Sequence, residues 1–315
     1  MKRRKALLII NGTAGTGGGG TGAYDIICGL VKGGCEVTVY PLLFKEGLSS
    51  ETIFEEIKEK GEEFDLIVCA GGDGTLNHVI TCMVRDGITT PLGYIPAGST
   101  NDFARSLGIP ADLEENCAAI TGGVPFAYDI GSFNDRYFNY VAAFGAFTSV
   151  SYQTDQTLKN ALGHAGYILN AALSLPENLS YSRRVKVTLD GTVLTDNFVF
   201  GSVSNATSVG GFSAPDRTDV SMDDGLFEIM LIRAPKTAED LGGILQAFAL
   251  GDTDNPYVHF FHAEHVVFES RRKIPWTLDG EFGGAVTRAE IGVLKKRIRI
   301  MVKGDSPQGL IKTKD

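Results

Sequence analysis

Short apolar runs alternate with amphipathic segments through the N-terminal third of the chain, and this alternation limits the possible folds more than any other feature. The strand-like runs span residues 5–10, 36–42 and 64–70. Apolar residues recur at helical spacing between and after them, over residues 23–31, 53–57 behind a Ser50 cap, and 76–83. Such alternation predicts a doubly wound α/β domain, with helices on both faces of a mostly parallel sheet and ligands at the carboxyl ends of the strands.

The pattern changes near residue 126, where strand-like runs with period-two alternation become frequent. These runs span residues 137–144, 183–189, 193–203, 226–233, 265–269, 274–278 and 298–302. Asp190-Gly191 joins two of them and has the sequence of a two-residue hairpin turn. Helical stretches are expected around 157–175 and 238–250.

We therefore expect two domains. An α/β domain would take residues 1–126 together with the tail at about 303–315, and a mostly antiparallel β-sandwich would take residues 127–302.

The formal net charge of −9 does not favour nucleic acid as a partner. Basic residues nevertheless gather in four clusters. Each cluster can be interpreted as a solvated strand end or as a patch that faces a membrane. The clusters are residues 2–5, Arg183 with Arg184 and Lys186, residues 271–273, and residues 295–299.

The five cysteines are odd in number and form no Cys-x-x-Cys pair, which is typical of reduced core thiols in a cytosolic protein. No apolar stretch is long enough to cross a bilayer. We therefore expect a cytoplasmic protein, with peripheral contact at the inner face of the membrane as an option. A homodimer stays open.

The sharpest local signal is Gly-Gly-Asp-Gly-Thr at residues 71–75, between an apolar strand and an amphipathic helix. Glycines let backbone amides approach phosphate oxygens, and the start of a helix adds donors and a favourable dipole. Bare phosphate would repel Asp73, so its expected role is to hold Mg²⁺, directly or through water. The alternative is a glycine-rich turn in which Asp73 caps the helix.

A second polar turn follows the next predicted strand, at residues 93–105. Hydroxyl, amide and carboxylate groups gather there between Ser99 and Asp102, at the same edge of the predicted sheet. Alone, this stretch is equally well explained as a helix cap. Two such turns at one sheet edge favour a phosphate-binding site.

These segments resemble the catalytic domain of the diacylglycerol kinase and sphingosine kinase family, in its bacterial lipid kinase form. The resemblance rests on residues 71–75 followed by Asn77, and on Pro-Ala-Gly-Ser-Thr-Asn-Asp-Phe-Ala-Arg at 96–105. It continues through Asp129-x-Gly131, residues 138–145, Gly163 with Tyr167, Pro215, Asp224-Gly225-Leu226 and Asp279-Gly280-Glu281. It implies an NAD kinase-like α/β domain that binds nucleotide, with ATP and Mg²⁺, and a β-sandwich domain that binds lipid or another substrate. It also implies phosphate transfer to a lipid at the membrane surface.

The resemblance also implies roles for the matched residues. The ATP-binding residues would be Asn11, Thr13, Gly15, Gly71, Gly72, Gly74, Thr75, Thr100 and Asn101. The catalytic carboxylates would be Asp73, Asp102, Asp279 and Glu281, with Glu281 as general base for the acceptor hydroxyl. Ser221, Asp224 and Leu226 align with a structural Mg²⁺ site of some bacterial members.

Two departures from the family pattern keep another function open. Gly12 replaces the usual proline, and His78 replaces the usual glutamate. The first alternative does not depend on these departures. It is an NAD kinase-like enzyme with a soluble acceptor, because that group shares the Gly-Gly-Asp-Gly loop and a related fold, although residues 101–105 disfavour it. A catalytically weak regulator that binds nucleotide or lipid is the second.

The acceptor lipid cannot be chosen from the residues. Diacylglycerol is the default by resemblance, and phosphatidylglycerol-like, sphingoid and polyprenol acceptors stay open. The candidate pocket residues Phe144, Phe147, Tyr167, Leu169 and Phe212 serve equally well as core. Trp276 is expected to be a core residue or an anchor between the domains. A metal site at His259, His262, Glu264 and His265 is the weaker interpretation, because this segment runs into a predicted strand.

Overall fold

A computed structural model describes residues 3–11, 22–98, 101–145, 182–205, 208–209, 212–213, 221–250 and 256–304. The chain divides into two compact units, Met1–Tyr128 with Lys296–Asp315, and Asp129–Lys295. It passes between the units within two strands, β5 (Val124–Phe133) and β15 (Glu281–Val302). The helix expected around 157–175 lies outside the described residues.

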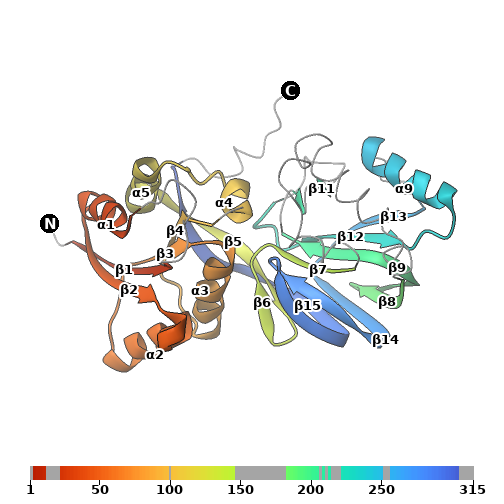
Figure 1. Cartoon of the computed structure of the whole chain (residues 1–315), viewed down its shortest axis with the longest axis horizontal. Coiled ribbons are helices and arrows are strands. Elements are labelled where there is room, and N and C mark those ends of the chain that lie inside the picture. Colours follow the sequence, from red (N-terminus) through yellow and green to blue (C-terminus); the bar gives the residue numbers. More distant parts are fainter. Residues whose placement is uncertain are drawn as a thin grey trace. The chain divides into compact units, whose positions relative to one another are not determined.

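The first unit is built on a parallel sheet in the order β15–β4–β3–β1–β2 (Figure 1). Its strands are β1 (Arg4–Asn11), β2 (Cys35–Leu42), β3 (Leu66–Gly71), β4 (Leu92–Pro96) and the last residues of β15. The central strand β3 is buried at all six residues, which explains its nearly continuous apolar sequence. The predicted doubly wound α/β fold is confirmed.

Helices cover both faces of this sheet, as Figure 1 shows, with α1 and α5 on one face and α2 and α3 on the other. Their bounds are α1 (Ala23–Lys32), α2 (Ser50–Lys60), α3 (Asp73–Arg85), α4 (Asp102–Ser106) and α5 (Leu113–Gly122), with the 3-10 turn η1 (Phe44–Glu46) before α2. The predicted apolar faces are buried, at Ile26 and Leu30 of α1 and at Leu76, Val79, Ile80 and Met83 of α3.

The N-cap of α2 is Ser49, and the prediction of Ser50 was wrong by one residue. The Ser49 hydroxyl accepts a hydrogen bond from the Thr52 amide, and the Thr52 hydroxyl accepts one from the Ser49 amide. This reciprocal pair satisfies two donors that a helix start leaves without partners. Ser50 becomes the first helical residue and is buried.

The second unit is mostly antiparallel, with strands in the order β13–β12–β9–β7–β14–β15. The strand β8 pairs with β14 and β9, and β6 pairs with β5. The remaining bounds are β6 (Arg136–Phe138), β7 (Val141–Gly145), β8 (Arg183–Leu189), β9 (Thr192–Ser204), β10 (Ser208–Val209), β11 (Phe212–Ser213), β12 (Phe227–Arg233), α9 (Ala238–Leu250), β13 (Val258–Ala263) and β14 (His265–Leu278). The predicted helix at 238–250 and the predicted antiparallel β-rich class are confirmed.

Aromatic side chains form the centre of this unit. Trp276 is 1% exposed and its ring centroid lies 4.8 Å from that of Phe144 and 5.1 Å from that of Phe268. Phe144 is therefore a core residue, which is one of the two roles, pocket or core, that the sequence left open. A second cluster lies under α9, where Ile244 and Ala247 pack against residues of β9 and β12.

Several strand predictions need correction. Residues 137–144 form two strands, because Asn139 and Tyr140 leave the sheet between β6 and β7. Residues 265–278 form one strand, whose register with β15 shifts at two places, and not two strands. The strand β13 and the long first part of β15 were not predicted at all. The hairpin at Asp190-Gly191 is confirmed, with φ of 43° and 95° at its two residues.

No helix in the described part of the chain is long and apolar enough to span a membrane.

Candidate active site

The turn after β3 is held tightly against the first turn of α3. Gly72 is the N-cap and Asp73 is the first helical residue, so the interpretation of Asp73 as the cap is wrong. Gly71 needs to lack a side chain, because a Cβ there would lie 2.7 Å from the Cβ of the buried Thr75. Asn11, at the end of β1, donates its amide to the Thr75 hydroxyl at 3.0 Å.

The turn after β4 is fixed by Asn101. This residue adopts the left-handed conformation, with φ of 50° and ψ of 46°, just before α4. Its side-chain oxygen accepts from the Gly98 amide at 2.9 Å, and its side-chain nitrogen donates to the Gly98 carbonyl at 2.9 Å. Asn101 thus braces the backbone of the turn with the side chain that was predicted to contact nucleotide.

The two turns meet at a pair of glycines. A Cβ on Gly72 would lie 3.3 Å from the Gly98 Cα, and a Cβ on Gly98 would lie 2.7 Å from the Gly72 Cα. The Ala97 amide also donates to the Gly71 carbonyl at 2.9 Å, beside the register pair Gly71 and Pro96. The structure therefore brings the two sequence-predicted segments together at one sheet edge.

The Asp73 carboxylate is half-buried and accepts a hydrogen bond from the Tyr94 hydroxyl at 3.4 Å. Tyr94 is fully buried on β4, and the buried Asn116 of α5 donates to its carbonyl at 3.0 Å. Sequence reasoning missed both residues. Tyr94 was attributed only to the strand, and its role depends on the register between β3 and β4.

Several predicted ATP contacts cannot be placed. Thr13, Gly15 and Thr100 lie outside the described residues, as does the side chain of Asp102, which begins α4. His78 faces Glu51 of α2, with 3.8 Å between the His78 Nδ1 and the Glu51 carboxylate.

The side chains at the two turns suit a Mg²⁺ ion whose coordination shell is completed by phosphate oxygens of a bound substrate. In the described residues no three His, Cys, Asp or Glu side chains gather into a metal-binding group. Asp73 supplies one carboxylate next to a glycine turn and a helix start. Mg²⁺ commonly takes one or two carboxylates together with water and phosphate oxygens.

In the second unit, Asp279 binds backbone amides with both carboxylate oxygens. One oxygen accepts from the Asn139 amide at 2.6 Å, and the other accepts from the Tyr140 and Val141 amides, each at 3.0 Å. The side chain is 6% exposed. Asp279 therefore fixes the break in the sheet between β6 and β7. The same hydrogen bonds hold the β14–β15 turn, which contains Asp279, in place.

Glu281 is an exposed residue at the start of β15, directly after the Asp279-Gly280 turn. It pairs with Leu278 across the hairpin, and both turn residues have positive φ, 49° and 85°. The turn is thus a tight two-residue connection that holds the Glu281 backbone in a defined position.

The segment from Ser221 to Leu226 is a compact turn that Asp129 holds from inside. The Asp129 carboxylate is fully buried and accepts from the Gly225 amide at 2.7 Å. The Asp224 side chain accepts from the Leu226 amide at 2.9 Å. The carbonyl, hydroxyl and carboxylate oxygens of this turn are hard ligands of the kind Mg²⁺ prefers. Asp129 was noted in the sequence only as a motif residue, without this role.

The four residues of the suggested histidine metal site do not share a helix. His259 and His262 lie on β13, where a spacing of three places them on opposite faces, and His265 lies on β14. Two of these histidines have other contacts. His259 stacks on Phe261, and His265 contacts the Glu290 carboxylate at 3.2 Å.

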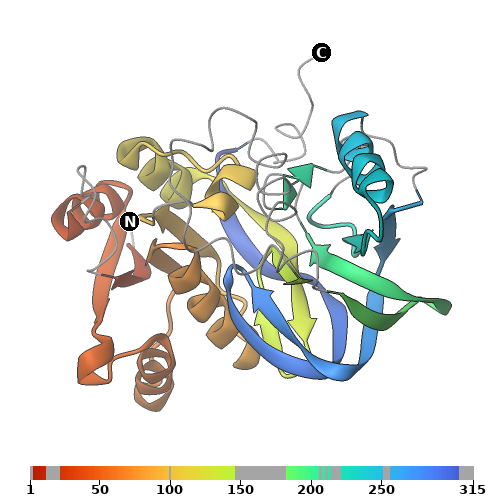
Figure 2. The same ribbon diagram turned by 45° about the vertical axis from the view of Figure 1, so that its right-hand side comes forward.

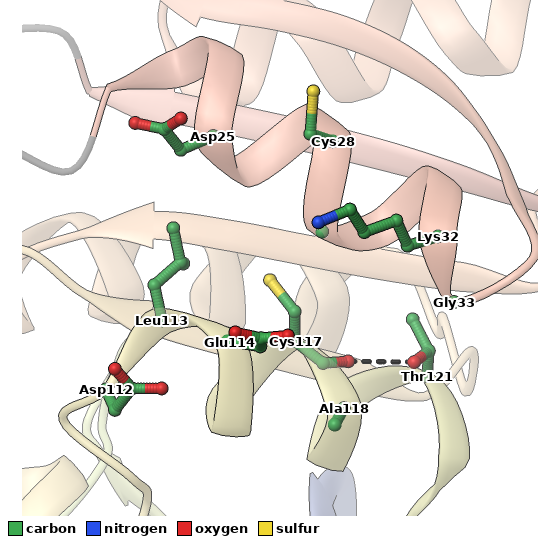
Figure 3. A pocket seen from close by; sticks show the side chains of 11 residues that line it. Asp25, Cys28, Lys32, Gly33, Asp112, Leu113, Glu114, Cys117, Ala118 and Thr121 are labelled. Carbon is green, nitrogen blue, oxygen red and sulfur yellow. Dashed lines mark hydrogen bonds between the residues drawn. The ribbon is translucent and has the colours of Figure 1, made fainter.

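A cavity of about 540 Å³ lies between α1 and α5, and none of the predicted site residues lines it (Figure 3). Figure 3 shows Cys117 of α5 pointing its sulfur toward α1, and the Thr121 hydroxyl donates to the Cys117 carbonyl at 2.8 Å. Burial raises the pKa of the Cys117 thiol to about 11. All five cysteines are free thiols, as predicted, and all except Cys28 are buried.

Comparison with known proteins finds two family matches along the chain. Residues 5–133 match the family described as "Diacylglycerol kinase catalytic domain", and residues 141–302 match the "YegS C-terminal NAD kinase beta sandwich-like domain". A "Diacylglycerol kinase" of Staphylococcus saprophyticus is 31% identical over 96% of this chain and 97% of its own length. One of Bacillus subtilis is 32% identical over 78% of this chain and 80% of its own length.

Solved structures show the same fold. A putative diacylglycerol kinase from Bacillus anthracis has a TM-score of 0.77 at 24% identity, and the match covers 96% of this chain and 98% of that one. A second structure described in the same words has a TM-score of 0.74 at 23% identity.

Proposed function

The chain belongs to the diacylglycerol kinase catalytic-domain family, and we propose that it transfers the γ-phosphate of ATP, with Mg²⁺, to the hydroxyl group of a lipid. Membership makes it a lipid kinase, a phosphotransferase with an alcohol group as acceptor. The proposal adds the donor, the metal and the acceptor. The printed names of the bacterial relatives make diacylglycerol the first acceptor to test.

One observation carries the proposal: the contact between the Gly72 and Gly98 backbones at the carboxyl edge of the parallel sheet. Two side-chain-free turns in contact leave a surface of main-chain groups, which is what close approach to phosphate oxygens requires. The amides at the start of the thirteen-residue helix α3 face the same edge and add the favourable end of the helix dipole.

Asp73 and Asp102 would hold Mg²⁺ beside these turns, with Asp73 in direct contact or through water. The metal would neutralise charge on the β- and γ-phosphates of ATP when it is bound. The hydrogen bond that the Tyr94 hydroxyl donates helps to orient the Asp73 carboxylate. Asn11, Thr75 and Asn101 would contact the nucleotide directly or brace the backbone that does.

The acceptor hydroxyl would attack the γ-phosphorus while the bond to the β–γ bridging oxygen breaks and ADP leaves. The hydroxyl proton would pass to the Glu281 carboxylate as general base. Asp279 acts as a positioning residue in this scheme, because its oxygens are engaged by the amides of residues 139–141. Ser221, Asp224 and the Leu226 carbonyl would hold a second, structural Mg²⁺.

The test is transfer of labelled phosphate from ATP to a panel of lipids in mixed detergent micelles, with and without Mg²⁺ and with NAD as a soluble acceptor. We expect labelling of one lipid class, and a loss of roughly 100-fold or more in both Asp73→Asn and Glu281→Gln. Asp135→Asn and Glu63→Gln make the same chemical changes at exposed carboxylates elsewhere and should keep full activity.

Labelling of NAD alone would replace this proposal with the NAD kinase-like alternative. ATP binding without labelling of any acceptor would instead favour a nucleotide-binding regulator. Full activity in Glu281→Gln would remove Glu281 from the role of base while leaving the lipid kinase assignment in place.

A further inference from the structure

We propose that the outer face of the β14–β15 hairpin docks on an anionic lipid bilayer, through the cations of residues 271–273 and the ring of Phe282. The inference rests on the proposed function, since a lipid acceptor has to be met at a membrane. The proposed contact with the bilayer is made by one surface of the second unit. Figures 1 and 2 show the two paired strands in blue.

The cations of residues 271–273 project from the hairpin because β14 and β15 are not regularly paired beside them. Glu269 pairs with Arg288 and Ile274 pairs with Val286, so four residues of β14 face a single residue of β15. In a regular strand, consecutive side chains alternate between faces. In this bulge Arg271, Arg272 and Lys273 are all exposed, and the Ser270 hydroxyl holds the turn by donating to the Arg272 carbonyl at 2.5 Å.

The sheet adds a fourth cation from a distant part of the sequence. Val185 of β8 pairs with Ser270 of β14, which brings the exposed Arg184 beside the bulge. Within the described part of the chain, Arg184 and the three bulge cations make no ion pair with any acidic side chain. In contrast, Lys186 on the same strand pairs with Glu269 at 2.9 Å.

Several cations of the other basic clusters have partners within the protein. Arg297 donates to the Val84 carbonyl at 2.8 Å at the end of α3, and Arg299 donates to the Thr89 carbonyl. Lys295 pairs with Glu264 at 2.8 Å, and Arg4 donates to the Thr121 carbonyl at 3.0 Å. Within the described part of the chain, the bulge cluster is therefore a basic patch of adjacent exposed cations without acidic partners, available for an external anion.

Apolar surface continues from this patch along the same face of the hairpin. Thr277 pairs with Phe282, and the exposed Pro275 pairs with the exposed Ala285. These residues alternate with the buried Ile274, Trp276 and Leu278, so they share the outward face. Phe282 is 67% exposed and lies roughly 13 Å along the strand from Lys273, next to Glu281.

This combination of chemistries fits a bilayer better than a nucleic acid. Cations attract anionic headgroups, and a nearby aromatic ring gains by entering the interfacial region. The formal net charge of −9 opposes approach to a polyanion that extends over the whole protein, whereas a planar membrane is met by one face alone. The placement also explains why an exposed phenylalanine stands beside the proposed base.

The test measures flotation of the full-length protein with vesicles of phosphatidylcholine alone and with about a third of phosphatidylglycerol, without nucleotide. The variants are Arg271→Gln/Arg272→Gln/Lys273→Gln and Phe282→Ser. The control, Lys45→Gln/Lys58→Gln/Lys236→Gln, removes three exposed cations from other places and changes the net charge equally. Each variant is also assayed with lipid in detergent micelles, where docking on a bilayer is not needed.

We expect the protein to bind anionic vesicles, and the bulge variant to bind them on the order of 100-fold more weakly, at roughly fivefold for each of the three cations. Phe282→Ser should weaken binding about tenfold. The control should bind as the unchanged protein does, and added salt should release all of them. Activity in micelles should stay the same in the bulge variant.

Equal binding by the bulge and control variants would overturn the inference, as would equal binding to neutral and anionic vesicles. Binding to duplex DNA that the bulge variant loses, with no vesicle binding, would replace it with a nucleic-acid surface. Failure of the proposed function looks different, because no acceptor would then be labelled in micelles even by the unchanged protein.

Discussion

Gly72 and Gly98 contact each other through their backbones, although they belong to turns that follow different strands. A Cβ on Gly98 would lie 2.7 Å from the Gly72 Cα and 2.9 Å from the Asn101 side-chain oxygen. Backbone atoms cannot move aside as the end of a flexible side chain can. Any side chain at Gly98 would therefore push the two turns apart.

Gly98→Ala should therefore reduce phosphotransfer by about 100-fold or more, because displacement of reacting groups by about 1 Å has an effect of that size. ATP binding measured by calorimetry should weaken in parallel. Gly122→Ala is the control, since a Cβ there meets nothing within 4 Å and α5 gains helix propensity. Normal ATP affinity in Gly98→Ala would show that the contact does not shape the site.

Asp279→Asn should destabilise the second unit, because an amide group cannot accept with both of its heavy atoms. Three backbone amides now bind the carboxylate, and at least one would face the Asn nitrogen. We expect a loss of about 2 kcal/mol in the free energy of unfolding, measured with urea. Asp135→Asn, in the exposed turn before β6, should change it by less than about 0.5 kcal/mol.

Gly29→Ala should lower stability through a clash between α1 and α5. A Cβ on Gly29 would lie 2.6 Å from the Cys117 sulfur and 3.0 Å from its Cβ. The steric cost of about 1–3 kcal/mol exceeds the gain of about 1 kcal/mol in helix propensity. Adding Cys117→Ala removes the sulfur, so the double variant should recover part of the loss in a double-mutant cycle. Additive effects would disprove the contact.

His259 should make the second unit less stable in acid. Burial and the nearby Arg233 guanidinium lower the pKa of this imidazole, while Asp196 acts in the opposite direction. The unfolded chain then binds a proton more readily than the folded one, so stability is complete above about pH 6.5 and falls as the pH drops below that value. Thermal unfolding of His259→Gln between pH 7.5 and 5 should show a flatter acid limb; an unchanged slope would assign the acid sensitivity elsewhere.

The turns of the first unit could be predicted from the sequence because their causes are local. Gly71, Gly72 and Gly98 stand directly after apolar strands, and a parallel sheet places the ends of neighbouring strands at one edge. The Tyr94 hydroxyl bond to Asp73 was beyond this reasoning. It depends on which residue of β4 lies opposite β3, and the apolar runs do not fix that register.

The missed features of the second unit have distant causes. The break at Asn139 and Tyr140 is held by Asp279, 140 residues away from Asn139 in the sequence. No apolar pattern records such a partner. The charged run at Arg271–Lys273 interrupted the alternation and suggested two strands, whereas the chain absorbs it as a bulge and continues. Charge and exposure were visible in the sequence, but continuity of hydrogen bonding was not.

The position of β15 sets the order in which the enzyme can be completed during synthesis. Ile300 pairs with Leu92 of β4, and Ile298 and Met301 are buried in the first unit. While the ribosome is still translating the second unit, β4 has an open edge, and the strand that carries the Gly98 turn lacks its neighbour. The sheet that carries the Gly72 and Gly98 turns is thus completed only after the second unit has been translated, so the N-terminal segment of the first unit cannot reach the final strand order by itself.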